Sequence, residues 1–431
     1  MLDKQVNFLK SKILRSVLII VSGTLGGQII GFLLIPIITR LYGPDLYGVW
    51  GIVISLISIL TPLITLSYSS AIILPEDDSE ARSLMQVSML IASLLSIILF
   101  IVFFLFSDKI SYFLNIEFLN NYLIVLPFLM LLIALRDVMQ SYLLRIKDFK
   151  VVSFSNFNQS LFTYGGQALA GKFYPSVFSL IFFYGISFLV NILMFIYLKK
   201  ISLRFLYLYN GINYRTLLGK YRDFPIYRAP QIFFNSLSYS FPVLMLTSMF
   251  GVKAAGFYTL TRTVLSLPVT LIGNSVQSVF YPHFNSLILK KKESYALLRK
   301  STFSIAILAF IPFGIIFLYG SEIFSIVFGR DWAEAGEYAK WLSILLYSTL
   351  FNKPAISIIP ILGLQKWFLI YEVVSLTIKL FGLFLGFLIY NSPVVAIALF
   401  SIIGFILSFI LNIKVFHVLK FKELIEEVRC V

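Results

Sequence analysis

Apolar runs long enough to cross a lipid bilayer recur from one end of this sequence to the other. An α-helix rises 1.5 Å per residue, so about 20 apolar residues span the roughly 30 Å hydrocarbon core of a membrane. Of the 431 residues, 59% are hydrophobic and only 13% are charged, and the mean hydropathy is +0.92. Soluble domains carry about twice that share of charged residues. The sequence therefore predicts an all-α integral membrane protein.

Polar breaks divide the apolar runs into twelve predicted spans. Six lie in the first half, at residues 16–39, 47–74, 83–106, 121–144, 151–171 and 175–198. Six more follow a basic segment, at residues 225–250, 256–282, 301–320, 338–361, 367–390 and 393–416. We expect an N-terminal six-helix lobe over 1–205, a basic cytoplasmic linker over 206–224, a C-terminal six-helix lobe over 225–416 and a cytoplasmic tail over 417–431. The first run is too long for the core of a signal peptide and is interpreted as a retained helix.

Lysine and arginine are distributed unevenly between the two sides of these spans. If the N-terminus is cytoplasmic, 25 of the 35 lysines and arginines fall on the cytoplasmic side, six fall outside and four fall within spans. The positive-inside rule therefore predicts that both termini are cytoplasmic. The acidic loop at residues 76–80 does not oppose this assignment, because carboxylates carry little weight in the rule. Topology explains most of the formal net charge of +15, so no nucleic-acid partner is expected.

One polar interruption occurs twice. TRLYGPDLYGVW at residues 39–50 separates the first two spans, and its pair Gly43 and Gly48 recurs as Gly251 and Gly256 in MFGVKAAGFYTL, at an offset of 208 residues. Three prolines recur at offsets of 206 or 207: Pro36 with Pro242, Pro62 with Pro268, and Pro75 with Pro282. We interpret the interruption as a short external hairpin that is built twice. Six spans per half give both halves one orientation, which predicts two pseudo-symmetric lobes around a central cavity.

A stripe of small residues marks the first predicted span. Gly23, Gly27 and Gly31 recur every four residues and so lie on one face of a helix. Such a stripe lets two membrane helices approach closely. We predict a close helix contact there.

Six charged residues lie inside predicted spans and more than four residues from either end, at Arg136, Asp137, Arg262, Lys353, Glu372 and Lys379. A charge at bilayer depth is costly, so it usually contacts a partner or a wet cavity, although snorkelling to an interface is the alternative for each. Arg136 and Lys353 have similar depths in the two halves and are predicted to face one cavity. Glu372 and Lys379 are seven residues apart and share a helix face. Four cations against two acids favour an anionic ligand.

Several amides also lie in the spans, at Asn156, Asn158, Gln159, Asn235, Asn274, Gln277 and Asn352. They are suited either to hydrogen-bonding sugar hydroxyls or to bonds between helices.

Motifs for catalysis and metal binding are not found. GQALAGKF at residues 166–173 has the G-x4-G-K spacing of a phosphate loop, but Phe173 stands where Ser or Thr should hold magnesium. His283 and His417 lie at opposite ends of the second half, and Cys430 is the single cysteine. No predicted loop exceeds about 20 residues. We therefore expect no metal, no cofactor and no enzymatic activity.

The hairpin, the twelve spans, the repeat and the cationic interior together resemble Wzx-type polysaccharide flippases of the multidrug/oligosaccharidyl-lipid/polysaccharide exporter superfamily. The similar stretches are TRLYGPDLYGVW, FGVKAAGFYTLTR and LRIKDFKVVSFSNF, and the resemblance covers nearly the whole chain. It implies a MATE-like fold in the bacterial inner membrane and alternating-access transfer of an undecaprenyl-diphosphate-linked oligosaccharide for O-antigen, lipopolysaccharide, capsule or exopolysaccharide synthesis. It also implies membrane lipids, a polysaccharide polymerase and chain-length proteins as candidate partners.

The resemblance assigns the cationic role by depth. Arg136, Arg262, Lys353 and Lys379 would attract the diphosphate or acidic sugars, with Arg40 at the external mouth. Asp137 and Glu372 are then partner acids or coupling acids.

Three other readings remain open from the sequence. A cation-coupled exporter of drugs or other small molecules would share the fold, but should carry carboxylates free to bind sodium or protons. A glycan polymerase or glycosyltransferase would need a large external loop or an acidic catalytic pair. A scaffold with no transport role would not need costly charges in its interior.

Overall fold

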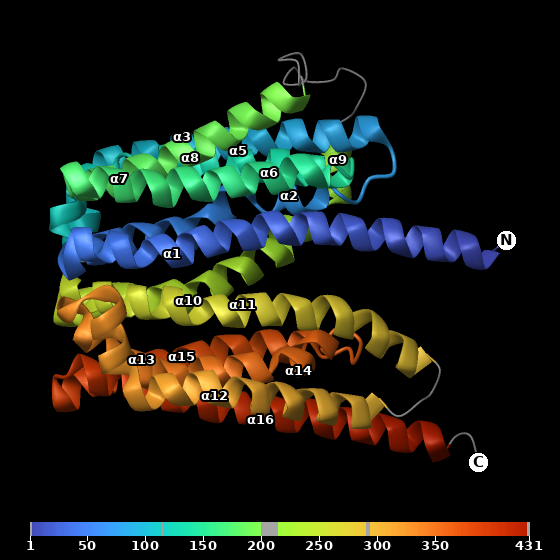
Figure 1. Cartoon of the computed structure of the whole chain (residues 1–431). Helices are drawn as coiled ribbons and strands as arrows, with labels where there is room; N and C mark the ends of the chain where they lie inside the picture. Colours follow the sequence, from blue (N-terminus) through green and yellow to red (C-terminus); the bar gives the residue numbers. More distant parts are fainter. Residues whose placement is uncertain (1, 114, 200–213, 290–293, 429–431) are drawn as a thin grey trace. The chain divides into compact units, whose positions relative to one another are not determined.

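The chain is folded almost entirely into helices, as a computed structural model shows (Figure 1). The structure describes residues 2–113, 115–199, 214–289 and 294–428, and no β-strand occurs within these ranges. The predicted all-α class is confirmed. Residues 206–213 of the predicted linker, Cys430, and the side chains of Asn274, Gln277 and His283 lie outside what is described.

The chain divides into two compact units, Met1–Ser248 and Met249–Val431. The first contains α1 (Leu2–Thr65), α2 (Tyr68–Ala71), α3 (Asp78–Phe113), η1 (Glu117–Leu119), α4 (Asn120–Leu123), α5 (Leu126–Arg145), α6 (Phe149–Ser160), η2 (Leu161–Gly165), α7 (Gly166–Phe173), α8 (Val177–Lys199), α9 (Tyr214–Lys220), η4 (Phe224–Arg228) and most of α10 (Ala229–Phe250). The second contains α11 (Val252–Leu289), α12 (Ser294–Phe328), η5 (Arg330–Trp332), α13 (Ala333–Phe351), α14 (Lys353–Ile358), α15 (Gln365–Tyr390) and α16 (Pro393–Val428). The sequence-based lobe limits at 205 and 225 stay a prediction.

Each of the twelve predicted spans lies on helical segments. Among the described residues, eight helices are long and apolar enough to cross a membrane: Leu25–Thr65, Asp78–Tyr112, Leu126–Arg145, Val177–Leu198, Phe224–Phe250, Ser294–Phe328, Gln365–Tyr390 and Pro393–Phe421. Leu25–Thr65 holds two predicted spans. The span at 151–171 is divided by the π-helix η2, and the span at 338–361 is divided between α13 and α14. The chain is a multi-pass membrane protein.

Gly43 and Gly251 adopt the same unusual backbone conformation. Gly43 interrupts α1 with φ 67° and ψ 173°, and Gly251, with φ 87°, separates α10 from α11. Positive φ is a region that side chains with a Cβ rarely adopt, which is why glycine stands at both helix breaks. The second glycine of each pair, Gly48 or Gly256, is buried inside the helix that follows. The repeated hairpin is therefore formed by one residue in each half. The match of Pro75 to Pro282 does not extend to structure, because Pro75 lies in a turn and Pro282 inside α11.

The predicted small-residue stripe is a close contact between α1 and α6. A Cβ atom added to Gly23 would collide with Ser153, and one added to Gly27 would lie 2.5 Å from Ser160 Oγ. One turn further, a Cβ on Gly31 would lie 2.7 Å from the Tyr164 ring in η2. Contacts that advance together along both helices mean that α1 and the α6–η2 helix run parallel. Parallel spans are what the first and fifth crossings of one lobe require.

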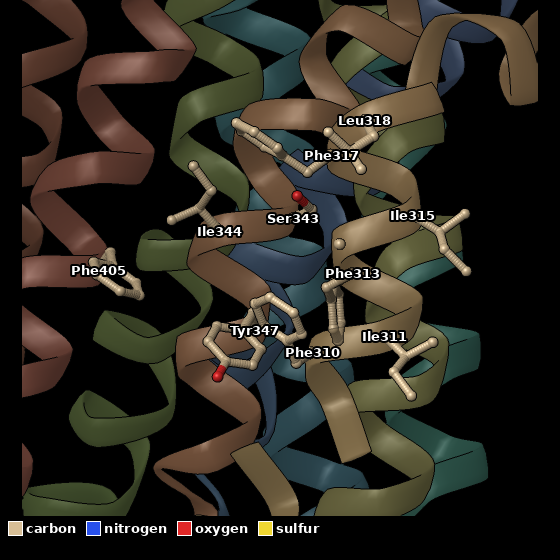
Figure 2. Close-up of a pocket in the computed structure, with 11 residues that line it drawn as sticks. Phe310, Ile311, Phe313, Ile315, Phe317, Leu318, Ser343, Ile344, Tyr347 and Phe405 are labelled. Carbon is tan, nitrogen blue, oxygen red and sulfur yellow. The ribbon is translucent and has the colours of Figure 1, made fainter. Parts of the chain in front are cut away.

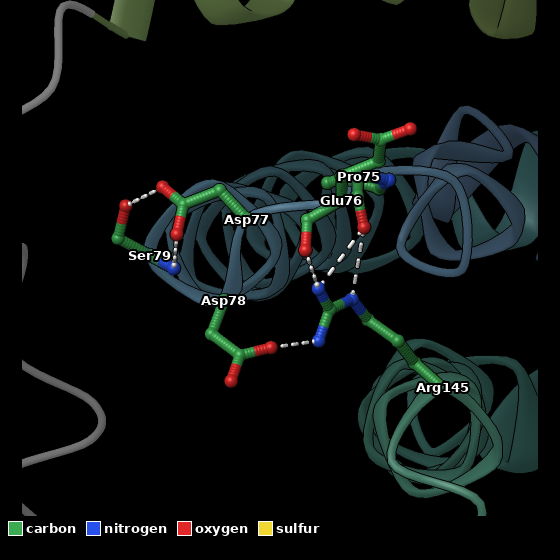
Figure 3. Close-up of polar contacts among 6 residues, drawn as sticks. All are labelled: Pro75, Glu76, Asp77, Asp78, Ser79 and Arg145. Carbon is green, nitrogen blue, oxygen red and sulfur yellow. Dashed lines mark hydrogen bonds and ion pairs between the residues drawn. The ribbon is translucent and has the colours of Figure 1, made fainter.

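The acidic loop between α2 and α3 is bound by an arginine from the end of α5 (Figure 3). The Arg145 guanidinium donates to the carbonyl oxygens of Pro75, at 3.0 and 3.3 Å, and of Glu76, at 3.0 Å, and it pairs with Asp78. Asp77 accepts hydrogen bonds from the hydroxyl and backbone N–H of Ser79, and these bonds lower the pKa of Asp77. The loop is thus held by the Asp77–Ser79 hydrogen bonds and by the contacts of Arg145.

A second cation reaches the same loop from α9. Lys220 Nζ lies 2.5 Å from Glu80 Oε1, the Tyr221 hydroxyl donates to that oxygen at 3.2 Å, and the bond to Glu80 raises the pKa of Lys220. Arg145 and Lys220 come from segments that the charge count places on the cytoplasmic side. Two of the four acids in this loop, Asp78 and Glu80, are therefore paired with cations from predicted inside segments.

The second unit is built on α13, which packs against α11, α12 and α16. Phe257 of α11 meets Trp332 and Tyr338 edge-on at 5.8 Å, and Thr261 donates to the Ala335 carbonyl at 2.8 Å. At the other end, Glu423 of α16 accepts from the backbone N–H groups of Ser294 at 2.6 Å and Tyr295 at 2.8 Å. A carboxylate at the N-terminus of α12 stabilises that helix end. The contacts of Phe257 and Thr261 fix α11, which carries Arg262, against α13.

Candidate functional site

Arg136 lies in the middle of α5 and is the centre of a polar network in the first unit. Its Nη1 donates to Asp137 Oδ1 at 2.8 Å and its Nη2 to Asn156 Oδ1 of α6 at 2.6 Å. The side chain is 15% exposed, and Nε is buried with no partner among the described residues. A cation in this setting is compensated by one acid and one amide, so Asp137 is a partner of Arg136 rather than a free acid.

The helix that carries Asn156 is held by several side-chain contacts. Asp148 caps its N-terminus by accepting from Val151 N–H at 3.4 Å. Asn191 of α8 donates to Gln159 Oε1 at 3.1 Å and to the Ser155 carbonyl at 3.2 Å. Gln159 therefore makes the interhelical bond that is the alternative to sugar binding. Immediately after Ser160 the helix widens into η2, and π-segments are frequent at functional sites.

Lys353 occupies a break in the second unit. It is the first residue of α14, after Asn352 ends α13, and its side chain is half-buried. A Cβ atom added to Gly273 of α11 would lie 2.8 Å from Lys353 Cε and 3.2 Å from Cδ. The lysine stem therefore runs across α11 at a position where no side chain stands. Neighbouring Asn352 is buried and bonded to Asn412 of α16, which leaves it no role as a free ligand.

Lys379 lies on α15 and packs against α16 in a similar way. Its Nζ lies 5.8 Å from the centroid of the buried Phe400 ring, and its Cδ would lie 3.2 Å from a Cβ added to Gly404. A cation over an aromatic face is attracted by the ring's electron density. Within the described residues, neither Lys353 nor Lys379 forms an ion pair with a carboxylate. Gly273 thus provides space for Lys353, and Gly404 provides space for Lys379, each from the helix next to the lysine.

Arg262 and Gly273, the glycine beside the Lys353 stem, lie on one face of α11. Arg262 is half-buried, and Gly273 follows it by eleven residues, which is close to three helical turns, or about 16 Å. Glu372 and Lys379 share a face of α15 two turns apart, as predicted, and Glu372 acts electrostatically on Lys379. Arg40 is exposed near the end of the first segment of α1, three residues before the Gly43 break.

The structure divides the predicted charged residues between its two units. Arg136, Asp137 and Arg40 belong to the first unit, where the first two are in direct contact. Arg262, Lys353, Glu372 and Lys379 belong to the second. Sequence reasoning missed Gly273 and Gly404, which give the lysines their space. In the sequence each of them is only a glycine inside an apolar span. Such a glycine indicates space for a lysine only when the helix that faces it is known.

The remaining amides divide between structural bonds and exposure. Asn158 donates to the Phe154 carbonyl of its own helix at 2.8 Å, and Asn235 is exposed. The G-x4-G-K run forms helix α7, where Lys172 is exposed. None of these positions is brought to a cation of the same unit.

Comparison with known proteins places this arrangement in a family. Residues 37–337, well over half of the chain, match the sequence profile described as "Polysaccharide biosynthesis protein". The chain belongs to this family. No curated protein matches the chain.

Solved structures with the same fold come from the MOP superfamily. An inward-facing multidrug resistance MATE transporter is 14% identical, with a TM-score of 0.71 over 90% of this chain and 94% of its own. The lipid II flippase MurJ in an inward closed conformation is 15% identical, with a TM-score of 0.72 over 94% and 90%. A MOP transporter from Pyrococcus furiosus, described as having a binding pocket of reversed polarity, is 14% identical, with a TM-score of 0.63 over 94% and 96%. The predicted MATE-like fold is confirmed.

Proposed function

We propose that this protein is a flippase that moves an undecaprenyl-diphosphate-linked oligosaccharide across the bacterial inner membrane for surface polysaccharide synthesis. The observation that carries the proposal is a pair of lysines in the second unit, Lys353 beside Gly273 and Lys379 beside Gly404, in a chain of a polysaccharide biosynthesis family. Glu372 acts electrostatically on Lys379, and neither lysine forms an ion pair with a carboxylate among the described residues. A cation at bilayer depth usually contacts a partner, a ligand or a wet cavity. A diphosphate offers the negative charge that two lysines would compensate.

The proposed residues act by charge and by hydrogen bonding. Lys353 and Lys379 would bind the diphosphate, because an ammonium group is a compact charge with three donors. Arg262, on the Lys353 face of α11, would guide the anion, and Arg40 would act at the external mouth. Arg136 keeps Asp137 and Asn156 as partners and would contact acidic or hydroxylated sugars. The polyprenyl chain would stay in lipid, and alternating access of the two lobes, with both termini cytoplasmic, would complete the transfer.

The experiment that tests this function is deletion of the gene in its own host. Lipid extraction would show whether polyprenyl-linked repeat units accumulate, and surface glycan would be measured in parallel. Complete repeat units on the lipid together with lost surface polymer support translocation.

Normal lipid intermediates and normal surface glycan would contradict the proposal. They would favour the alternative, a cation-coupled exporter of drugs or other small molecules, which efflux assays under sodium or proton gradients would examine.

A further inference from the structure

An apolar groove opens on the second unit between α12, α13 and α16 (Figure 2). Its volume is about 570 Å³, and its walls include Phe310, Phe313, Phe317, Ile344, Tyr347 and Phe405. Gly314 lies in its floor, and nothing lies within 4 Å of the position that a Cβ atom would take there. The groove is therefore a real gap in the packing of three helices.

The groove is lined by apolar side chains that are largely exposed. The apolar window of α12 is only 17% buried, and Phe310, Ile311 and Leu318 are more than 60% exposed. The Ser343 hydroxyl is used inside its own helix, where it donates to the Lys340 carbonyl at 2.6 Å. An occupant must therefore be a hydrocarbon.

The size of the groove indicates which hydrocarbon. A methylene group has roughly the volume of a water molecule in the liquid, about 30 Å³, so the groove accommodates on the order of 20 carbons. That matches one whole acyl chain of a phospholipid. A polyprenyl chain with several tens of carbons would leave most of its length outside.

Charges of both signs lie next to the Leu318 end of the groove, before the end of α12. Phe317, in the groove wall, packs edge-on against Trp341 at 6.2 Å, and tryptophan is enriched at the level of lipid headgroups. One turn beyond Phe317, Gly320 contacts Gly336 and the Lys340 stem. Lys340 Nζ lies 2.8 Å from Glu337 Oε1, and the two side chains are 27% and 40% exposed. A matched cation and anion are complementary to a headgroup that carries both charges.

We propose that this groove is a binding site for a zwitterionic diacyl phospholipid such as phosphatidylethanolamine. One acyl chain lies along Phe310 to Leu318, the phosphate contacts Lys340, and the ammonium contacts Glu337. The site depends only on the surface of the second unit and does not rest on the proposed flippase activity.

The test is native mass spectrometry of the full-length protein, delipidated in detergent and titrated with phosphatidylethanolamine, phosphatidylglycerol or undecaprenyl phosphate. Gly314→Phe places a ring in the groove, and nothing lies within 4 Å of the position that its Cβ atom would take. Leu308→Phe is the matched control, because Leu308 is 72% exposed on the same helix and does not line the groove. We expect Gly314→Phe to weaken phosphatidylethanolamine binding at least ten-fold and Leu308→Phe to change it less than two-fold.

A headgroup variant separates the two parts of the site. Glu337→Gln should weaken binding about three- to ten-fold and reduce the preference for phosphatidylethanolamine over phosphatidylglycerol, because it removes the carboxylate that contacts the ammonium. Unchanged binding in Gly314→Phe, tighter binding of phosphatidylglycerol or undecaprenyl phosphate to the wild-type protein, or no binding of any of the three lipids would each overturn the proposal. Melting temperatures of all variants in detergent identify a misfolded one, and Gly314→Leu then replaces Gly314→Phe.

Discussion

The two units hold their membrane cations in contrasting ways. In the first, Arg136 contacts Asp137 and Asn156, so its charge is largely compensated within the protein. In the second, Lys353 and Lys379 have glycines beside their stems, and neither contacts a carboxylate among the described residues. An arginine with a planar fork suits fixed bidentate bonds, whereas a lysine on a flexible stem suits a ligand that comes and goes. A shared architecture has thus acquired a fixed charge network in one half and adaptable cations in the other.

The largest effect should come from the second unit. Lys353→Ala and Lys379→Ala should each reduce transfer of the lipid-linked oligosaccharide at least 30-fold, because each removes a cation from the proposed diphosphate site. The measurement is the accumulated lipid-linked repeat unit and the surface glycan in a deletion strain that expresses each variant. Lys353→Arg keeps the charge and should restore part of the activity.

Membrane abundance of the lysine variants should be close to that of the wild type, since neither lysine forms an ion pair with a carboxylate among the described residues and Lys379→Ala loses only the contact with the Phe400 ring and its stem packing. Full transfer by both alanine variants would remove the contrast between the units.

Replacement of Arg136 should affect both folding and transport. Arg136→Ala leaves Asp137 without its cation and should reduce transfer about ten-fold. It should also destabilise the protein by about 1–2 kcal/mol, less than a fully buried pair would lose because Asp137 is 43% exposed. The double variant Arg136→Ala/Asp137→Ala tells the two effects apart, with thermal unfolding in detergent and transfer in cells as the readouts.

If the double variant recovers both stability and transfer, Arg136 has a structural role alone. Recovery of stability without recovery of transfer would support contact with the sugar.

Gly273, which lies beside the Lys353 stem, allows a test of whether the position of Lys353 matters. Gly273→Ala should move the lysine stem by a few tenths of an ångström or more and reduce transfer about three- to ten-fold, with normal abundance. Gly314→Ala is the matched control, because it adds the same methyl group to a helical glycine with open space around it. Equal activity of the two variants would show that the position of Lys353 does not matter.

The smallest expected effect compares the two helix breaks. Gly43→Ala and Gly251→Ala should each cost about 1–2 kcal/mol of stability, since alanine resists positive φ and neither position has a heavy atom within 4 Å of an added Cβ. Thermal unfolding of both variants measures the cost. Clearly unequal losses would mean that the repeated motif no longer has the same role in both halves.

The features that the sequence predicted depend on local physics. Span length follows from bilayer thickness, and the role of Gly43 and Gly251 follows from the backbone freedom of glycine. The stripe of Gly23, Gly27 and Gly31 needed only helical periodicity. The residues that contact the site residues were harder to predict, because most of them belong to other helices.

Three contacts show why. Arg136 and Asp137 are adjacent in sequence, yet neighbouring residues on a helix diverge by about 100°, so their ion pair is not implied by adjacency. Gly404 matters only because Lys379 of another helix lies across it. Arg145 binds a loop seventy residues away, at Pro75. Each depends on helix packing that no local pattern encodes.

The break at Gly43 also limits how the first unit can move. Only one residue separates the two helical segments of α1, so a single φ and ψ pair connects the rotation of one membrane crossing to that of the next. The first segment is packed against α6 through glycines that admit no slack. A tilt of that helix pair relative to the second segment would be taken up by φ and ψ at Gly43. The two helical segments of α1 are thus joined at a single residue whose φ and ψ set the angle between them.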